Sequence, residues 1–259
     1  MNILLSNDDG ILAPGIRCLA AALAQHHQVT VVAPDRERSA TGHALTLHKP
    51  LRVEAVGDPY PAGVAAWACS GTPADCVKFG LDALLKTTPP DWVIAGINRG
   101  ANLGTDVLYS GTVSAAMEGL LEGIPSLAIS LASYSAKEVQ DFQGAADFAL
   151  SLLTKLGIPS VPTLLNVNVP AGAKIRGCVV VPLGVRKYVD IYEQRSDPRG
   201  KDYYWLAGEV ITDGVDPDTD LHAIQQDWIT ITPLQFNLTD WEQLGMYSRW
   251  FTPYRQATG

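Results

Sequence analysis

Two adjacent aspartates, Asp8 and Asp9, lie shortly after an apolar segment at the start of the chain and precede Gly10. Two neighbouring carboxylates repel each other unless a cation or a proton compensates their charge. Combined with hydroxyl and amide oxygens, such carboxylates suit a hard ion such as Mg²⁺ or Mn²⁺ better than Zn²⁺. Taken alone, the segment is equally consistent with a plain turn ahead of a helix.

Polar residues also follow two later apolar segments. Ser39 ends the polar stretch after Gln28–Pro34, and Asn98 follows Trp92–Ile97. Asn98 alone is more typical of a turn than of a ligand. If the apolar segments are strands of one parallel sheet, their carboxyl ends lie at one edge, where ligands bind in open α/β sheets. We therefore expect these polar loops to converge.

The segment Ser110-Gly111-Thr112 leads directly into a predicted helix. A serine at this position ordinarily caps the helix, and we favour that function for the segment alone. The free N–H groups of a helix start also bind anions, so a nearby cation would make a phosphate site more plausible. Tyr109 is adjacent to this site.

Other catalytic signatures are missing from the sequence. It contains no P-loop, no HExxH and no GxSxG motif. His43 could serve as an acid or base, although a solvated or capping histidine is the more ordinary interpretation.

Strand-like and helical patterns alternate along most of the chain, which predicts an α/β fold with a Rossmann-like, doubly wound, mostly parallel sheet. Thr72 and Pro73 are typical of a helix start. The predicted strands are Asn2–Leu5, Gln28–Pro34, Leu51–Val56, Val64–Cys69, Trp92–Ile97, Ser126–Leu131, Leu164–Val169, Ile175–Val181 and Asp227–Thr232. The predicted helices are Gly15–His27, Thr72–Leu85, Thr112–Glu122, Ala136–Leu156 and Asp240–Tyr247.

The pattern changes after about Lys174. Arg186–Glu209 is rich in tyrosine and charge and predicts a long hairpin that turns at Asp197-Pro198-Arg199-Gly200. An isolated hairpin buries little surface, so we expect it to contact another subunit. Thr212–Asp220, with four aspartates, predicts an exposed loop. We assign residues 1–182 to the catalytic core and 183–259 to a hairpin and C-terminal arm of the same domain.

Composition limits the class of protein. The chain has 259 residues, 47% hydrophobic and 18% charged, as expected for one large folded domain. The net charge of −8 and the lack of a basic run argue against binding to duplex nucleic acid. No apolar run approaches membrane-spanning length. The four cysteines lack metal or redox spacing and predict buried free thiols, which favours a cytoplasmic protein.

Several segments together resemble the SurE family of metal-dependent nucleotidases, also called stationary-phase survival proteins. The matching segments, in order, are MNILLSNDDGILAPGI, APDRERSATGHALTLHKPLR, CSGTPADCVKFGL, GINRGANLGTDVLYSGTVSAAMEG and LLNVNVP. The resemblance covers residues 1–182 and is looser beyond. Ala95 and Ala40 depart from residues common in the family, Ser and Gly respectively, but neither position is a metal ligand.

The resemblance implies one divalent cation per subunit, held by Asp8, Asp9, Ser39 and Asn98. It also implies hydrolysis of nucleoside 5′- and 3′-monophosphates, trimming of short polyphosphate by some members, and a homodimer or homotetramer assembled through the C-terminal arm. We expect Asp8 and Asp9 to be catalytic. The predicted phosphate and substrate contacts are Asn102, Ser110, Gly111 and Thr112. The alternative function is a non-catalytic, metal-dependent nucleotide-binding module.

Overall fold

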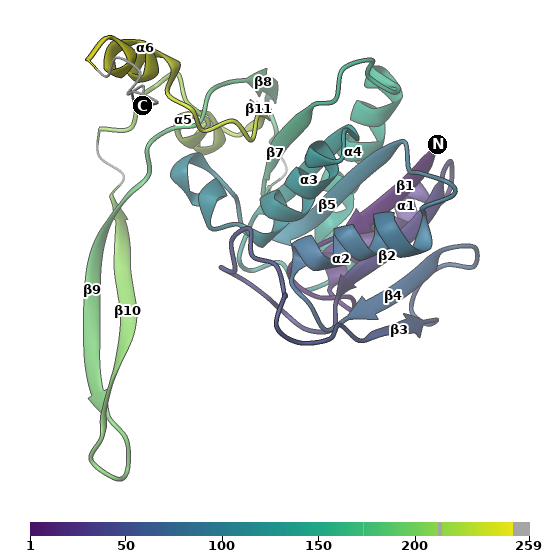
Figure 1. The fold of residues 1–259 in the computed structure, drawn as a ribbon, viewed down its shortest axis with the longest axis horizontal. Helices are drawn as coiled ribbons and strands as arrows, with labels where there is room; N and C mark the ends of the chain where they lie inside the picture. Colours follow the sequence, from purple (N-terminus) through teal and green to yellow (C-terminus); the bar gives the residue numbers. More distant parts are fainter. Residues whose placement is uncertain (173, 212–213, 251–259) are drawn as a thin grey trace, which may run out of the picture.

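The computed structural model describes residues 1–172, 174–211 and 214–250. Its main sheet has the strand order β3-β4-β2-β1-β5-β6-β7-β11-β8 (Figure 1). The strands are β1 (Asn2–Ser6), β2 (Gln28–Pro34), β3 (Val53–Val56), β4 (Ala65–Cys69), β5 (Trp92–Arg99), β6 (Ser126–Ala132), β7 (Leu164–Pro170), β8 (Gly177–Val180) and β11 (Trp228–Leu234). The helices are α1 (Pro14–Leu23), α2 (Pro73–Phe79), α3 (Gly111–Leu121), α4 (Gln143–Leu156), α5 (Asp220–Gln225) and α6 (Trp241–Trp250).

The centre of the sheet is parallel. Strand β1 pairs in parallel with β2 on one side and with β5 on the other. The chain builds outwards from β1 through β2 and β4, then returns to place β5 and β6 on the opposite side. The strand order therefore reverses between β1 and β5, which is the place where open α/β sheets bind ligands. The prediction of a doubly wound, mostly parallel sheet is confirmed.

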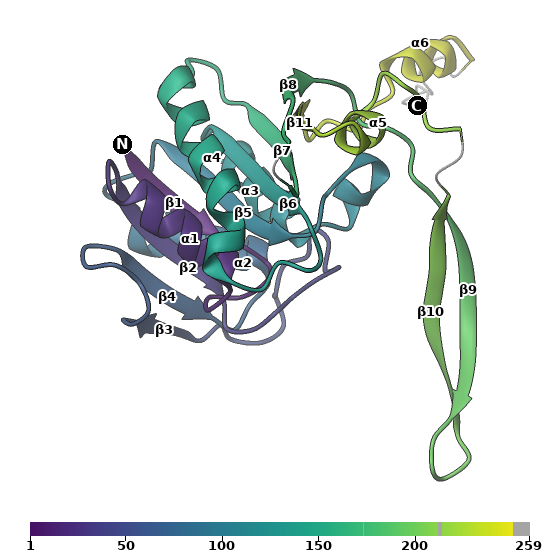
Figure 2. The same ribbon diagram turned by 180° about the vertical axis from the view of Figure 1, so that it is seen from behind.

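Helices cover both faces of this sheet. In β1, Ile3 and Leu5 belong to one hydrophobic core and Leu4 to the other, because successive side chains of a strand point to opposite faces. Helices α1 and α4 pack together on the first face, and α2 and α3 pack together on the second. Figures 1 and 2 view the molecule from opposite sides and show these two layers.

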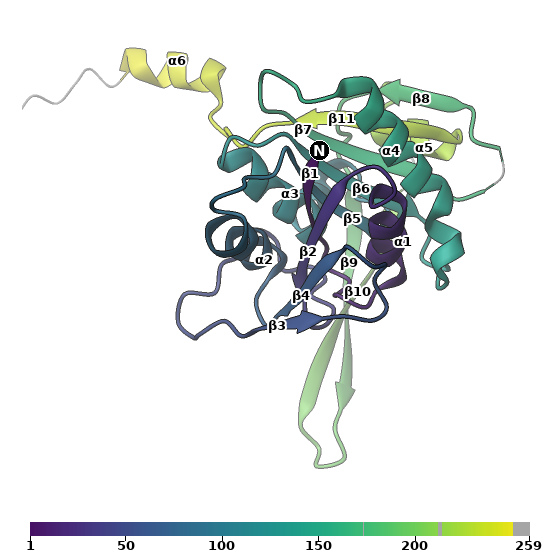
Figure 3. The same cartoon turned by 90° about the vertical axis from the view of Figure 1, so that its right-hand side faces the viewer.

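The predicted hairpin is formed by β9 (Lys187–Ser196) and β10 (Asp202–Ile211), which pair antiparallel. At its tip, the N–H of Gly200 donates to the carbonyl of Asp197 at 2.9 Å. The ribbon extends away from the main sheet (Figure 3), and Tyr192 and Leu206 are 68% and 64% exposed. Helix α6 has no buried residue. None of the helices within the described ranges has the length and apolar character needed to cross a membrane.

Three sequence expectations are wrong in detail. The helix expected over Ala136–Leu156 starts at Gln143 after the 3-10 turn η3 (Val139–Phe142), because the Asp141 carboxylate accepts hydrogen bonds from the preceding backbone and holds it in a turn. The helix expected over Thr72–Leu85 ends at Phe79 and continues as the π-helical turn η1 (Gly80–Leu84). Cys178 is exposed, whereas the other three cysteines are buried free thiols.

Asp220 was expected in an exposed loop but is fully buried. Its carboxylate accepts hydrogen bonds from the N–H groups of Gly104 and Gly184, each at 2.8 Å. Gly104 begins the 3-10 turn η2 (Gly104–Leu108), so this aspartate fixes a segment that leads towards α3. Thr212 and Asp213, from the same expected loop, lie outside the described residues.

Candidate active site

The carboxyl ends of the central strands surround a cavity of about 270 Å³. Predicted site residues from four separate segments line it, namely Asp8, Asp9, Ser39, Asn98, Asn102 and Ser110. The convergence follows from the topology, because β1, β2 and β5 run in parallel and end at the same edge. Gly111 and Thr112 lie directly behind this lining at the start of α3.

The loop after β1 is held in a closed turn by Asn7. The side-chain amide of Asn7 donates to the carbonyl of Gly10 at 3.0 Å, and the Gly10 N–H donates back to Asn7 Oδ1 at 3.2 Å. The Arg38 N–H donates to the carbonyl of Asp8 at 2.7 Å, which ties this loop to the one after β2. Gly10 has φ +101°, a left-handed conformation that favours glycine.

Asp8 lies on the floor of the cavity and is only 5% exposed. The hydroxyl of Thr112 donates to its Oδ1 atom. Burial raises the pKa of Asp8 to about 6, the Thr112 hydrogen bond opposes that rise, and the neighbouring charge of Asp9 adds to it. The protein thus holds a buried carboxylate whose charge is poorly compensated, and such a group favours binding of a cation or a proton.

Asp9 is more accessible than Asp8 and receives a hydrogen bond from the N–H of Arg99 at 3.1 Å. Burial raises its pKa, and the hydrogen bond and charge of Arg99 partly oppose this effect. Asn98, the preceding residue, donates through Nδ2 to the carbonyl of Gly100 at 2.8 Å. Because the nitrogen is engaged, Oδ1 is the Asn98 atom available to a cation.

Ser39 is exposed at the rim, and its hydroxyl donates to Glu37 Oε1 at 2.8 Å. Glu37 also lines the cavity and raises the pKa of both Asp8 and Asp9 through its negative charge. The sequence interpretation did not select Glu37, although it lies two residues before Ser39 in the same loop. A third carboxylate increases the negative potential at this edge.

The residue that caps the start of α3 also lines the cavity. Ser110 is the N-cap, and its hydroxyl accepts a hydrogen bond from the Val113 N–H at 3.1 Å. The N–H groups of Gly111 and Thr112 belong to the first turn, which has no intrahelical acceptors. The Thr112 side chain is fully buried and donates its hydroxyl to Asp8, so it orients that carboxylate. The phosphate contact expected of Thr112 stays a prediction.

Asn102 lines the cavity and belongs to a buried amide network. Its backbone N–H donates to Asn168 Oδ1 at 2.7 Å, and its side-chain nitrogen donates to the Ser130 hydroxyl at 2.9 Å. Asn166 and Asn168 both donate to its carbonyl. These bonds fix the loop after β5, and one of the two side-chain N–H groups of Asn102 is engaged within the protein. Substrate binding by Asn102 stays a prediction.

The cavity lining also contains Asp106 and Tyr134, which the sequence patterns did not predict as site residues. Asp106 pairs with Arg186 at 2.7 Å and accepts a hydrogen bond from the Tyr188 hydroxyl, which connects the rim to the root of the hairpin. Tyr134 comes from the loop after β6 (Ser126–Ala132). That loop also follows a parallel strand, and the same topological argument would have found it.

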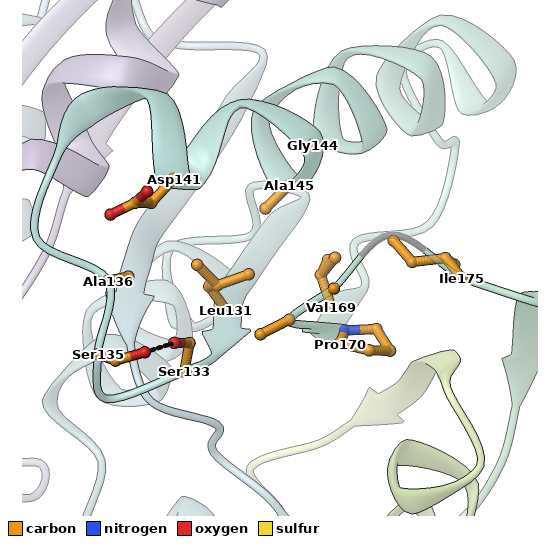
Figure 4. Close-up of a pocket in the computed structure, with 12 residues that line it drawn as sticks. Leu131, Ser133, Ser135, Ala136, Asp141, Gly144, Ala145, Val169, Pro170 and Ile175 are labelled. Atoms are coloured by element: carbon orange, nitrogen blue, oxygen red, sulfur yellow. Dashed lines mark hydrogen bonds between the residues drawn. The ribbon is translucent and has the colours of Figure 1, made fainter.

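A second cavity, of about 330 Å³, lies at the ends of β6 and β7 beside α4 (Figure 4). It contains none of the predicted site residues. His43 is elsewhere as well, with Nε2 2.7 Å from Glu118 Oε1, and it is not part of the Asp8 cavity lining. The predicted residues therefore converge on the Asp8 cavity, which is separate from the second cavity and does not include His43.

The donor set of the Asp8 cavity fits a hard cation. Within the described ranges, no lysine or arginine side chain forms an ion pair with Asp8 or Asp9. Nor do three His, Cys, Asp or Glu side chains form a metal-binding group in that part of the chain. The candidate set instead adds the Ser39 hydroxyl and the Asn98 amide oxygen to two carboxylates, and all four are oxygen donors.

Most of the chain matches the model of a known protein family. A family model described as "Survival protein SurE" matches residues 3–190. The chain belongs to the SurE family. That match includes every predicted ligand and the whole of the cavity lining.

Curated SurE relatives and a solved SurE structure extend the similarity to nearly the whole chain. The chain is 66% identical to the "5′-nucleotidase SurE" of Synechococcus sp. (strain JA-3-3Ab), over 96% of this chain and 97% of the relative. It is 56% identical to the protein of the same name from a Cyanothece species, over 96% of each. The crystal structure of SurE from Aquifex aeolicus matches with a TM-score of 0.81 and 37% identity, covering 96% of this chain and 99% of that one.

Proposed function

We propose that this chain is a divalent-metal-dependent phosphatase that hydrolyses nucleoside 5′-monophosphates to nucleoside and phosphate. The observation that carries the proposal is the convergence of Asp8, Asp9, Ser39 and Asn98 on one cavity at the start of α3. Relatives named 5′-nucleotidase SurE, similar over almost the full chain, support the substrate class. The resemblance noted in the sequence also supports hydrolysis of 3′-monophosphates and short polyphosphate as further activities.

The cation in this proposal is Mg²⁺ or Mn²⁺, one per subunit. Two carboxylates, a hydroxyl and an amide oxygen are the ligand types that these ions prefer. When bound, the cation supplies positive charge for the phosphate oxygens and lowers the pKa of a water molecule. Without a cation, Asp8, Asp9 and Glu37 would repel a phosphate dianion from this cavity.

The start of α3 provides the second attraction for phosphate in this scheme. The first-turn N–H groups of Gly111 and Thr112 and the helix dipole favour negative charge at this position. Ser110 caps the helix and lines the cavity, so it defines where the helix begins relative to Asp8. Charge stabilisation and orientation of this kind supply most of the rate enhancement in phosphoryl transfer.

Asp8 and Asp9 have different roles in the proposed reaction. Asp8 is buried and held by Thr112, so it acts as a fixed ligand that sets the position of the phosphoryl group. Asp9 is more accessible and can accept a proton from the attacking water. In this scheme water is the nucleophile. Isolation of a phosphoaspartyl enzyme during turnover would instead make a carboxylate the nucleophile.

The proposed assembly is a homodimer or homotetramer formed through the hairpin and the C-terminal arm. Its support is the exposure of apolar side chains on the β9–β10 ribbon and along α6, because a free two-stranded ribbon is marginal in water. The proposed location is the cytoplasm, since buried free thiols such as Cys18, Cys69 and Cys76 are typical of a reducing compartment.

Incubation with AMP in the presence of Mn²⁺ tests the activity, with adenosine and phosphate measured separately. The proposal expects the two products in equal amounts from the wild-type protein and almost none from Asp9→Asn. Binding of AMP by calorimetry without any product would favour the non-catalytic binding module. If the protein neither binds AMP nor releases product from it, both functions are contradicted.

A further inference from the structure

Two exposed tyrosines stand at the rim of the Asp8 cavity. Tyr109 precedes the cap of α3, and Tyr134 follows β6. They are 68% and 78% exposed, yet both belong to the same cavity lining as Asp8 and Asp9. Neither ring contributes to either hydrophobic core. The two rings therefore present aromatic surface to a molecule that enters the cavity.

Tyr134 is held in a defined place despite its exposure. Its ring lies against Gly100, where an added Cβ would be 2.5 Å from ring atom Cε1. The Gly100 N–H donates to the Leu131 carbonyl at 2.9 Å, and the Ser133 N–H reaches the same carbonyl at 2.7 Å. Ser133 and Ser135 flank Tyr134 in the sequence. Their hydroxyls lie 3.0 Å apart (Figure 4). One edge of the ring rests on glycine backbone while most of its surface stays open.

The size of the cavity indicates what lies against that open surface. Its volume of about 270 Å³ is slightly below the roughly 300–1,000 Å³ of pockets that enclose a whole small molecule. A nucleoside monophosphate with its phosphate at the start of α3 would thus extend onto the rim. The part that projects furthest from the phosphate is the flat aromatic base, and a fixed aromatic ring is a suitable surface for stacking.

We propose that Tyr134 stacks against the nucleobase of the substrate and so positions the nucleoside, an inference that rests on the proposed function. Every base has a π-face, so stacking alone discriminates weakly among bases. The structure therefore assigns this site to nucleotides as a class, with adenine and guanine derivatives bound somewhat better than pyrimidines because their rings are larger. Gly100 is part of this device, because any side chain there would displace the ring.

Steady-state kinetics of the Mn²⁺-loaded full-length protein tests the assignment with AMP and ribose 5-phosphate, which lacks a base. For Tyr134→Ala we expect the KM for AMP to rise roughly tenfold, with kcat changed less than about twofold. Ribose 5-phosphate should be hydrolysed with the wild-type kcat/KM. Tyr134→Phe, which keeps the ring, should behave as wild type with both substrates.

Three results would overturn the assignment: an unchanged KM for AMP in Tyr134→Ala, an equal loss for AMP and ribose 5-phosphate, or a Tyr134→Phe defect equal to that of Tyr134→Ala. Calorimetric binding of AMP provides a readout that needs no turnover. If the wild-type protein hydrolyses no phosphomonoester but binds AMP more tightly than Tyr134→Ala does, the proposed function fails and stacking stands. If the wild-type protein hydrolyses AMP and Tyr134→Ala has no effect, the proposed function stands and the stacking fails.

Discussion

A Cβ atom at Gly111 would lie 2.7 Å from the Cβ of Asp8. Glycine at the first position of α3 thus lets the helix start approach the buried carboxylate more closely than any other residue would allow. The next residue, Thr112, uses this proximity to donate its hydroxyl to Asp8. The predicted metal ligand and the predicted phosphate-binding helix are consequently one packed unit.

Gly111→Ala should disrupt the close packing of Asp8 against the start of α3. The added methyl group has to displace Asp8 or the start of α3, and a misplacement of about 1 Å in an active site costs on the order of 10²-fold in rate. We expect kcat/KM for AMP to fall by about that factor and the free energy of unfolding to fall by about 1–3 kcal/mol. Kinetics and urea unfolding measure the two effects.

Gly144→Ala is the matched control, because Gly144 lies in α4 and a Cβ there meets no atom within 4 Å. This variant should keep wild-type activity and gain up to about 1 kcal/mol, as expected for alanine in place of glycine in a helix. If Gly111→Ala and Gly144→Ala had the same activity, the close packing of Gly111 on Asp8 would have no part in the site.

The raised pKa of Asp8 predicts a pH-dependent stability of the metal-free protein. Its value of about 6 exceeds the ordinary 3.8 because burial disfavours the charged form. Between these values the folded state holds more protons than the unfolded state, so stability falls as the pH rises through this interval. We expect Asp8→Asn to stabilise the metal-free protein by about 1–3 kcal/mol near pH 7.5, while abolishing AMP hydrolysis.

The gain from Asp8→Asn should shrink as the pH falls from about 6 towards 4, where the native carboxyl is itself protonated. Thermal unfolding in the presence of a chelator, at several pH values, measures this difference between the two proteins. A variant that is less stable than wild type near neutral pH would show that Asp8 is well compensated without a cation.

The hairpin supplies a separate prediction about assembly. Tyr192 and Leu206 are paired across β9 and β10 and project together on one side of the ribbon. Leu206→Asp places a charge among these exposed apolar groups, and we expect it to shift the protein from oligomer to monomer in sedimentation velocity. Leu206→Met keeps an apolar side chain of similar volume and should keep the assembly. A wild-type protein that sediments as a monomer at micromolar concentration would contradict the proposed interface.

The sequence was sufficient to predict the sheet and the convergence at its edge. Asp8 and Asp9 follow the apolar strand β1, and Asn98 is the second-last residue of β5. Parallel strands bring their carboxyl ends together, so no knowledge of side-chain packing was needed. Thr72 and Pro73 begin α2 as predicted, because capping depends on a few neighbouring residues. The division of the chain at residue 182 within one domain stays a prediction.

What the sequence did not predict depends on contacts between distant segments. The bond from Thr112 to Asp8 joins residues 104 positions apart. The buried Asp220 resembles its acidic neighbours in sequence, and only its contacts with Gly104 and Gly184 distinguish it. Tyr134 lies in a loop that the topological argument could have selected, but the closeness of its ring to Gly100 has no signal in the local sequence.

The most direct test of the central claim is phosphate release from AMP by protein stripped of metal with a chelator. The account predicts no release without added metal, recovery of activity on titration with Mn²⁺ or Mg²⁺, and no recovery in Asp9→Ala at the same metal concentrations. Calorimetry on the same samples should show binding of about one ion per subunit to wild type and greatly weakened binding to the variant. Full activity in the stripped protein, or equal activity in wild type and Asp9→Ala, would contradict the metal-dependent mechanism.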